Sequence, residues 1–266
     1  MELGKKSTYD SHYNPDRLFA IQRAPNRHDL GIKDSLPFLG YNIWNHYEVS
    51  WLNLRGKPQV ATAQIVYSCE SQNIIESKSL KLYFNSLNNS RYENSKSVEE
   101  IVTRDLSSCL KSPVSVSIQL LTQDLSQTLS CLTAISIDDL DIEIDNFEID
   151  TTTLKIGDNV ITETLCSNLL KSNCLVTGQP DWGSLWVSYT GRQILHDSLL
   201  RYIVSFRNHN EFHEHCVERI FMDISRNCGP SELTVGARYT RRGGIDINPV
   251  RSTQTTPILN HRLIRQ

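Results

Sequence analysis

Hydrophobic and polar positions in the first half of the chain predict a β-hairpin, a helix and a further strand. Residues 48–54 and 60–67 are rich in β-branched and aromatic residues, and the turn-forming stretch 55–58 separates them. Such a pair of segments is typical of a hairpin. Apolar residues then recur at helical spacing over 98–110 and alternate with polar residues over 114–120. This pattern predicts a helix followed by a half-buried strand.

The expected helix carries signals at both of its ends. Ser97 and Glu100 have the spacing of a capping box, in which each side chain binds a backbone N–H at the start of a helix. Pro113 follows the last apolar position, and proline cannot continue a helix. We therefore expect the helix to begin near Ser97 and to end before Pro113.

The second half repeats this order of elements. A short strand is predicted over 185–189, a helical face over 194–204, a second helix from about Phe212, and a strand over 233–239. Two similar units of strands and helices predict an α+β chain that arose by internal duplication.

These units divide the chain into four expected parts. Residues 1–45 hold three prolines and no sustained period, which predicts an N-terminal arm, and a first module (46–137), a bridging segment (138–161) and a second module (162–266) follow. Acidic residues alternate with isoleucine over 138–150. The alternation favours an edge strand with a solvated face over a metal-binding loop, because the ligand spacing of an EF-hand is missing.

Composition and charge exclude several classes of protein. The 266 residues include 27 basic and 30 acidic ones, a net charge of -3, so the overall charge does not favour nucleic acid or an anionic membrane surface as a partner. Residues 1–7 are polar and charged, and no run of about 18 apolar residues occurs, so we expect a cytoplasmic protein. The seven cysteines include no CxxC pair, which argues against a disulfide framework and a four-cysteine zinc site.

The first candidate site is the loop that contains Cys174 and Asp181. Gly178 and Pro180 lie between them and favour a turn, so the chain can fold back and bring the carboxyl group towards the thiol. A thiol beside an acid that can donate and accept protons is the minimum for covalent catalysis. The alternative is a buried cysteine followed by an aspartate that caps a turn.

The second candidate site is the polar stretch 208–216, just before and within the start of the expected second helix. It places His213 and Glu214 among two further histidines and another glutamate. A buried Glu can accept hydrogen bonds from a flat heterocycle, and an adjacent His can relay protons. The same residues could instead cap the helix, or His213 and Cys216 could bind zinc together with Cys174.

Two further blocks carry positive charge beside small residues. Ile75, Glu76, Ser77 and Lys78 begin a block with two lysines and two hydroxyl groups, which suits phosphate contacts or a solvated strand end. In the second block, two arginines precede two glycines over 241–244, a pattern that can clamp a phosphate. Neither a GxGxxG nor a GxxxxGK[ST] motif is present, so a dinucleotide would be bound outside the Rossmann and P-loop plans.

Taken together and in this order, the four blocks resemble the NADPH-dependent 7-cyano-7-deazaguanine reductases, the nitrile-reducing enzymes of queuosine biosynthesis, in their long two-module form. The resemblance covers nearly the whole chain, from Gly4 and Tyr9 to Asn248. Two departures are small: Leu175 replaces a proline that usually follows the cysteine, and Ser68 with Cys69 replaces a proline-bearing stretch.

The resemblance implies a role for each candidate residue. Cys174 would add to the nitrile as a nucleophile and form a covalent thioimide, and Asp181 would donate the proton. The remaining roles are assigned as follows: substrate binding to Ile75, Glu76, Ser77, His213 and Glu214, and binding of NADPH to Ser77, Lys78, Arg242 and Gly243. No metal is implied.

The resemblance also implies a fold and an assembly. The expected fold is the tunnelling fold, two tandem modules of antiparallel sheet with helices packed on one face, and the expected assembly is a homodimer that acts on a small molecule.

Two other functions remain open from the residues alone. One is a zinc cyclohydrolase of the same fold, with Cys174, His213 and Cys216 as ligands. The other is a nucleobase-binding module in which Cys174 is merely buried. The sequence also leaves open whether Cys174 and Cys216 form a protective disulfide.

Overall fold

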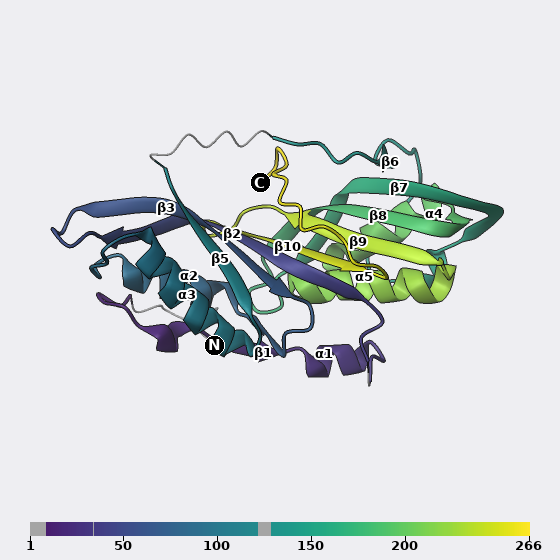
Figure 1. The fold of residues 1–266 in the computed structure, drawn as a ribbon. Helices are drawn as coiled ribbons and strands as arrows, with labels where there is room; N and C mark the ends of the chain where they lie inside the picture. The colour runs from purple at the N-terminus through teal and green to yellow at the C-terminus, as the bar shows by residue number, and fades with distance from the viewer. Residues whose placement is uncertain (1–8, 34, 122–128) are drawn as a thin grey trace. The chain divides into compact units, whose positions relative to one another are not determined.

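The structure, a computed structural model, describes residues 9–33, 35–121 and 129–266 (Figure 1). The strands are β1 (Ala20–Gln22), β2 (Leu39–Leu52), β3 (Pro58–Ser68), β4 (Asn73–Ile75), β5 (Val114–Leu120), β6 (Ile135–Ser136), β7 (Ile156–Asn173), β8 (Pro180–Ile194), β9 (Glu232–Tyr239) and β10 (Ile245–Ser252). The helices are α1 (Ala24–Asp29), α2 (Ser77–Leu87), α3 (Ser95–Leu110), α4 (His196–Val204) and α5 (His213–Cys228), with 3₁₀ turns η1 (Pro15–Arg17), η2 (Thr151–Thr153) and η3 (Ser205–Asn208).

The chain forms two units whose segments are interleaved along the sequence. One unit consists of Met1–His28, Asn42–Thr128 and Arg241–Ile247, and the other of Asp29–Tyr41, Leu129–Thr240 and Asn248–Gln266. The sequence analysis, by contrast, separates the two modules at a single place, the bridging segment 138–161. These boundaries remain a prediction about domains.

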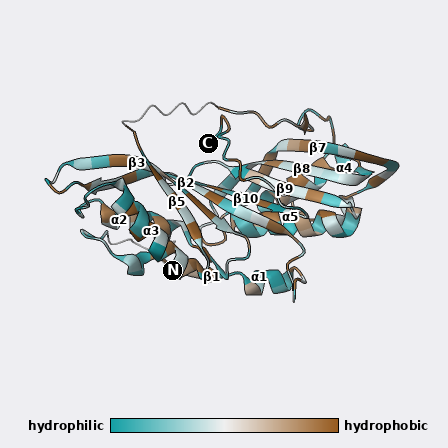
Figure 2. Cartoon of the chain, viewed as in Figure 1, coloured by the Kyte–Doolittle hydropathy of each residue, from teal (hydrophilic) through white to brown (hydrophobic). Residues whose placement is uncertain are grey.

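The first unit is an antiparallel sheet with helices α2 and α3 on one face. Its strands follow the order β5–β3–β2, and β3 pairs with β5 from Ala61↔Leu120 to Tyr67↔Val114. Apolar side chains of these strands form one cluster with those of α2 and α3. Buried and exposed positions alternate along β5, and Figure 2 shows hydrophobic residues alternating with more polar ones on the strands of this sheet.

The second unit is built around the long hairpin of β7 and β8. Its strands follow the order β10–β9–β8–β7–β6, and α4 and α5 pack against β7, β8 and β9. The short β6 pairs with β7 in parallel, whereas β7, β8, β9 and β10 pair in an antiparallel manner. The predicted α+β class, with mainly antiparallel sheet and helices packed on one face, is confirmed.

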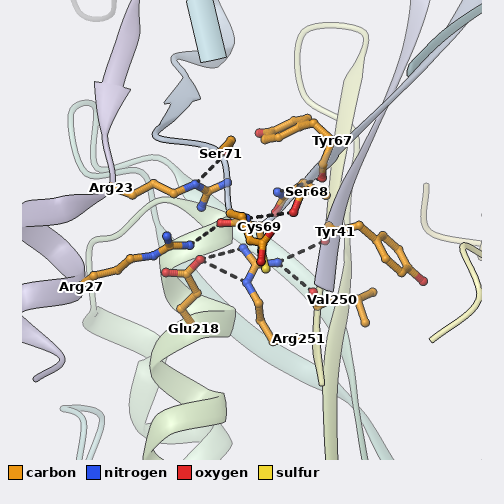
Figure 3. Close-up of polar contacts among 12 residues, drawn as sticks. Arg23, Arg27, Tyr41, Tyr67, Ser68, Cys69, Ser71, Glu218, Val250 and Arg251 are labelled. Carbon is orange, nitrogen blue, oxygen red and sulfur yellow. Dashed lines mark hydrogen bonds and ion pairs between the residues drawn. The ribbon is translucent and has the colours of Figure 1, made fainter. Parts of the chain in front are cut away.

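Each unit contains a buried arginine that donates to a buried acceptor of the same unit (Figure 3). In the second unit, Arg251 donates from Nη2 to Glu218 Oε1 at 2.8 Å and from Nη1 to the Tyr41 carbonyl at 3.1 Å, and both charged side chains are fully buried. In the first unit, Arg27 Nη2 donates to the Cys69 carbonyl at 2.6 Å. Such pairing offsets the cost of removing charges from water.

The predicted hairpin, the helix before Pro113 and the strand over 114–120 are confirmed as β2, β3, α3 and β5. The strands and helices predicted in the second half are confirmed as β8, α4, α5 and β9. Within the part of the chain that the structure describes, no helix is long and apolar enough to cross a membrane.

The predicted capping box is wrong. Helix α3 begins at Ser95, and Asn94 is its N-cap, because the Asn94 side chain accepts a hydrogen bond from the Ser97 N–H at 3.0 Å. Ser97 therefore supplies a donor to the cap instead of acting as the cap.

The edge strand predicted over 138–150 is also wrong, because this stretch has no strand. Ile142 and Ile144 are half-buried between exposed acidic residues. The alternation therefore predicts correctly which side chains are exposed, but the segment forms no β-ladder with another strand. Polar groups hold it instead: the Asp138 carboxylate accepts hydrogen bonds from Ser167 Oγ at 2.6 Å and from the Asn168 N–H at 2.9 Å.

Candidate active site

Cys174 begins the tight loop that connects β7 to β8. Its N–H donates to the Gln179 carbonyl at 2.8 Å, and its own carbonyl accepts from the Gly178 N–H at 3.0 Å. Gly178 has a φ of +67°, a conformation that glycine adopts without steric cost. The Cys174 residue is only 4% exposed, so the loop holds a buried thiol in a closed turn.

The hairpin folds the chain back so that Asp181 lies across from the strand that leads to Cys174. Asp181 pairs with Ser172 in the antiparallel ladder of β7 and β8. Residues that face each other across such a ladder point to the same side of the sheet. Asp181 is 3% exposed. A buried carboxyl group therefore lies on β8, within the last two residue pairs of the ladder before the Cys174 loop.

His213, the first residue of α5, contacts this carboxyl group. Its Nε2 atom lies 3.4 Å from Asp181 Oδ1, and the two side chains are 12% and 2% exposed. Glu214 follows in the first turn of α5 and is buried. The structure therefore brings Asp181 and His213 into contact inside the second unit, and Cys174 follows the strand that pairs with Asp181.

The start of α5 is fixed to the end of β7 by backbone hydrogen bonds. The Asn173 N–H donates to the His209 carbonyl at 2.8 Å, and the Glu211 N–H donates to the Asn173 carbonyl at 3.1 Å. Lys171 adds to this connection, because its Nζ donates to Asn173 Oδ1 at 2.7 Å and to the Arg207 carbonyl at 2.6 Å. These bonds position His213 relative to the loop that begins at Cys174.

Glu211 anchors the same segment through a buried charge network. Its carboxylate lies 2.9 Å from His209 Nε2 and accepts hydrogen bonds at 3.1 Å from Nε and Nη2 of Arg219. Burial alone would raise the pKa of Glu211, but the bonds from His209 and Arg219 outweigh burial and lower it. The sequence analysis missed the supporting roles of Glu211, Arg219 and Lys171, because their partners lie on other elements.

Two further buried groups lie beside the His213–Asp181 pair. The Tyr239 ring contacts the His213 imidazole edge to face, with ring centroids 4.0 Å apart. Burial and the nearby Glu211 raise the pKa of Cys216 to about 12, so this thiol stays protonated at neutral pH. The hydrophobic pattern of the sequence marks both Tyr239 and Cys216 only as ordinary core positions.

Glu76 and its neighbours occupy the start of α2 in the first unit. Ile75 ends β4, and Glu76 is the N-cap of α2: its carboxylate accepts hydrogen bonds from the N–H groups of Lys78 at 2.7 Å and Ser79 at 2.9 Å. Burial raises the pKa of Glu76 despite these two bonds. The alternative interpretation of a solvated strand end is wrong for Glu76, which is fully buried.

The predicted cofactor residues also lie in the first unit. Arg242 and Ile245 exchange backbone hydrogen bonds at 2.9 and 3.1 Å around a turn in which Gly243 and Gly244 have φ values of +58° and +76°. A Cβ atom on Gly243 would lie 3.3 Å from Lys81 Cδ. The turn therefore approaches the lysine-bearing face of α2 closely, which only a residue without a side chain permits.

The surroundings of this turn suit an anionic group. Lys78 and Lys81 line a cavity of about 140 Å³. The Arg241 guanidinium lies over the Tyr47 ring at 3.5 Å, and its buried Nε and Nη2 atoms have no hydrogen-bond partner among the described residues. Buried donors without acceptors are costly, so these lysines and arginines fit the phosphates of a dinucleotide.

The zinc alternative requires Cys174, His213 and Cys216 to converge as ligands. Within residues 9–33, 35–121 and 129–266, no group of three or more His, Cys, Asp or Glu side chains is arranged to hold a metal ion.

Comparisons with known proteins cover the whole chain. Residues 9–118 match the family model described as "Nitrile reductase, 7-cyano-7-deazaguanine-reductase N-term", and residues 180–257 match that of a QueF-like protein. Two relatives from Legionella pneumophila, strains Lens and Paris, are named NADPH-dependent 7-cyano-7-deazaguanine reductase, and each is 53% identical over all of this chain and 94% of its own length.

A solved structure, the archaeosine synthase QueF-Like in the apo form, aligns with 38% of this chain and 99% of its own chain. Its sequence identity is 14% and its TM-score is 0.32, a likeness too weak to support an argument about fold or function. The full-length relatives are decisive: the chain belongs to the family of NADPH-dependent 7-cyano-7-deazaguanine reductases.

Proposed function

We propose that this chain reduces the nitrile of 7-cyano-7-deazaguanine to the aminomethyl group of 7-aminomethyl-7-deazaguanine with two NADPH, as a step of tRNA queuosine biosynthesis. The relatives that carry this activity in their names are 53% identical over the full chain. The observation that carries the proposal within the structure is the buried Asp181–His213 pair, 3.4 Å apart, beside the loop that begins at Cys174.

Cys174 starts the reaction as the nucleophile. Its sulfur forms a bond to the nitrile carbon while one of the C≡N π bonds opens, and the nitrogen takes up a proton. The product of this step is a thioimide, in which an inert triple bond has become a C=N bond that a hydride can attack. The tight loop around Cys174 limits the positions of the sulfur, which favours attack from one direction.

Asp181 donates the proton to the nitrogen, and His213 contacts it from the start of α5. Both side chains are shielded from bulk water, so proton transfer to the substrate does not compete with transfer to solvent. His213 and Glu214 bind the deazaguanine, because a carboxylate accepts hydrogen bonds from the N–H edge of a purine-like ring. For Ile75, Glu76 and Ser77 of the first unit, substrate binding follows from the family resemblance alone.

NADPH, when bound, would supply the two hydrides that take the nitrile to the amine. The C–S bond to Cys174 would break after the first hydride has added, with the Cys174 thiolate as the leaving group, and the second hydride would reduce the resulting imine. Ser77, Lys78, Arg242 and Gly243 would bind it. The arginine fork matches phosphate oxygens in a bidentate geometry, and the glycine turn lets the backbone come close to them.

The chain acts in the cytoplasm as a homodimer and binds a small molecule rather than nucleic acid or a membrane. Light scattering of the purified protein should give about twice the 30.4 kDa of one chain. A mass equal to one chain would contradict the dimer without affecting the proposed reaction.

The reaction itself is tested by stoichiometry. When 7-cyano-7-deazaguanine is limiting, about two NADPH should be oxidised for each substrate, as followed by nicotinamide absorbance and by mass spectrometry of the amine. NADH in place of NADPH is the matched control and should react more slowly, because it lacks the 2′-phosphate that arginines bind. The proposal fails if NADPH is not consumed, or if the substrate changes without it.

A further inference from the structure

We propose that Tyr239 is a positioning residue that holds the His213 imidazole against Asp181. The inference rests on the proposed function only in so far as that pair serves proton transfer to the substrate. The family resemblance assigns no role to Tyr239, although it assigns cofactor binding to Arg242, three residues further on.

The register of β8 and β9 places Tyr239 beside Asp181. Tyr239 pairs with Gly183 across the ladder, and Asp181 precedes Gly183 by two residues, so all three are on the same face of the sheet. A Cβ atom on Gly183 would lie 3.3 Å from both Cδ1 and Cε1 of the Tyr239 ring. The ring therefore packs directly on the glycine, in space that a larger residue at position 183 would take.

The Tyr239 ring and the Asp181 carboxyl group both contact the His213 imidazole. The centroids of the two rings are 4.0 Å apart at an angle of 70°, shorter than the usual range of about 4.5–7 Å for aromatic pairs. His213 Nε2 lies 3.4 Å from Asp181 Oδ1. The imidazole thus has a carboxyl group at one nitrogen and an aromatic ring packed against it, and the close packing limits the orientations that it can take.

The contact uses the ring of Tyr239 and not its hydroxyl group. The residue is 1% exposed, and burial, followed by the neighbouring Cys216, raises the pKa of its hydroxyl well above the ordinary value. The hydroxyl therefore remains protonated at neutral pH. Tyr239→Phe keeps the ring and is a matched control for Tyr239→Leu, which removes it.

The test is a double-mutant cycle on the NMR signals of the His213 ring in the full chain at one fixed pH, without substrate or cofactor. The signals of histidine-labelled protein are assigned to His213 by their loss in His213→Asn. Asp181 from β8 and the Tyr239 ring from β9 both contact the imidazole. Asp181→Asn should shift the His213 ring signals, because it removes the carboxylate that lies 3.4 Å from Nε2.

The proposal predicts that this effect depends on the ring. In a Tyr239→Phe background, Asp181→Asn should shift the His213 signals as far as it does in the wild type, whereas in Tyr239→Leu the shift should fall below about one third of that change. A full shift in Tyr239→Leu would overturn the proposal, as would an equal loss in Tyr239→Phe. If Tyr239→Leu does not fold, Gly183→Ala, which crowds the ring, takes its place in the cycle under the same criteria.

Kinetics supply a second measurement. In the nitrile reductase assay, Tyr239→Leu should lower kcat by about 10- to 100-fold with little change in KM, and Tyr239→Phe should stay within about threefold of the wild type. Because the NMR cycle needs no substrate, it tests the positioning role even if the chain does not reduce the nitrile. Conversely, an active enzyme whose cycle shows no dependence on the ring would retain the proposed function and refute this inference.

Discussion

At the scale of single residues, the contrast between Cys174 and Cys216 gives the most direct test of the nucleophile. Both lie in the second unit, and neither is part of a disulfide. Cys216 lies on α5, where its raised pKa of about 12 keeps it protonated. Incubation with 7-cyano-7-deazaguanine and no NADPH should add the full mass of the substrate to the wild type, because thiol addition to a nitrile releases no fragment.

Cys174→Ala should abolish this mass gain, and Cys216→Ala, the matched control, should retain it. Intact-protein mass spectrometry measures both. An adduct that persists without Cys174, or that disappears only in Cys216→Ala, would identify a different nucleophile.

The sequence could predict the residues of the site that carry chemistry, but not those that position them. Cys174, Asp181, His213 and Glu214 follow from residue types in a recognisable order along the chain. Tyr239 depends on a register, because it faces Gly183 across a ladder of two strands that are far apart in sequence. No local sequence pattern encodes that pairing, so the neighbours of Tyr239 could be known only from the folded structure.

At the scale of elements, the start of α5 depends on Glu211 because no side chain caps the helix at Phe212. The folded-state pKa of Glu211 is lowered, so its stabilising effect is fully present above the unfolded pKa of about 4.5 and is lost as the pH falls below that value. In Glu211→Gln, stability should fall by about 1–3 kcal/mol at pH 7, and its decline between about pH 5 and 3 should be shallower.

Urea unfolding at a series of pH values measures this effect. Arg219→Gln is the companion variant, because it removes the cation that helps to lower the pKa of Glu211, and it should also make the decline shallower. If the free energy of unfolding of Glu211→Gln fell as steeply with decreasing pH as that of the wild type, other carboxyl groups would control acid unfolding.

The elements that the sequence analysis missed have polar residues that are satisfied only by distant partners. All eight residues of β10 are buried, although Asp246, Asn248 and Pro249 within it are typical of a turn. The Asn248 side chain accepts from Gln266 Nε2 at 2.7 Å, and Arg251 pairs with Glu218. Strand β7 was not predicted at all, because its many Ser, Thr and Asn residues obscure the alternation.

At the scale of the whole molecule, the C-terminal part of the chain completes the first unit. Residues 241–247 belong to that unit, and Ile245 and Ile247 lie in its hydrophobic cluster. A division of the chain by composition and linkers assigns each stretch to its neighbours in sequence, so it could not predict this exchange. The first unit is therefore complete only with residues 241–247 in place.

Asp246→Ala should destabilise the first unit even though Asp246 follows the bulk of that unit by more than 100 positions in the chain. Asp246 is 1% exposed, and its carboxylate accepts hydrogen bonds at 2.8 Å from Asn45 Nδ2 and from the Tyr47 hydroxyl. Removing it leaves two donors on β2 without an acceptor, at a cost of about 1–3 kcal/mol. Hydrogen exchange should accelerate in β2 and β3 more than in β7 and β8.

Asp158→Ala is the matched control for the loss of one carboxylate. Asp158 is fully exposed and pairs with the half-exposed Arg192, and such surface ion pairs contribute little to stability, so protection should not change in either unit. If Asp246→Ala accelerated exchange to the same extent in β7 and β8 as in β2, the two units would unfold as one cooperative body. If instead only residues next to position 246 were affected, the segment 241–247 would be a dispensable part of the first unit.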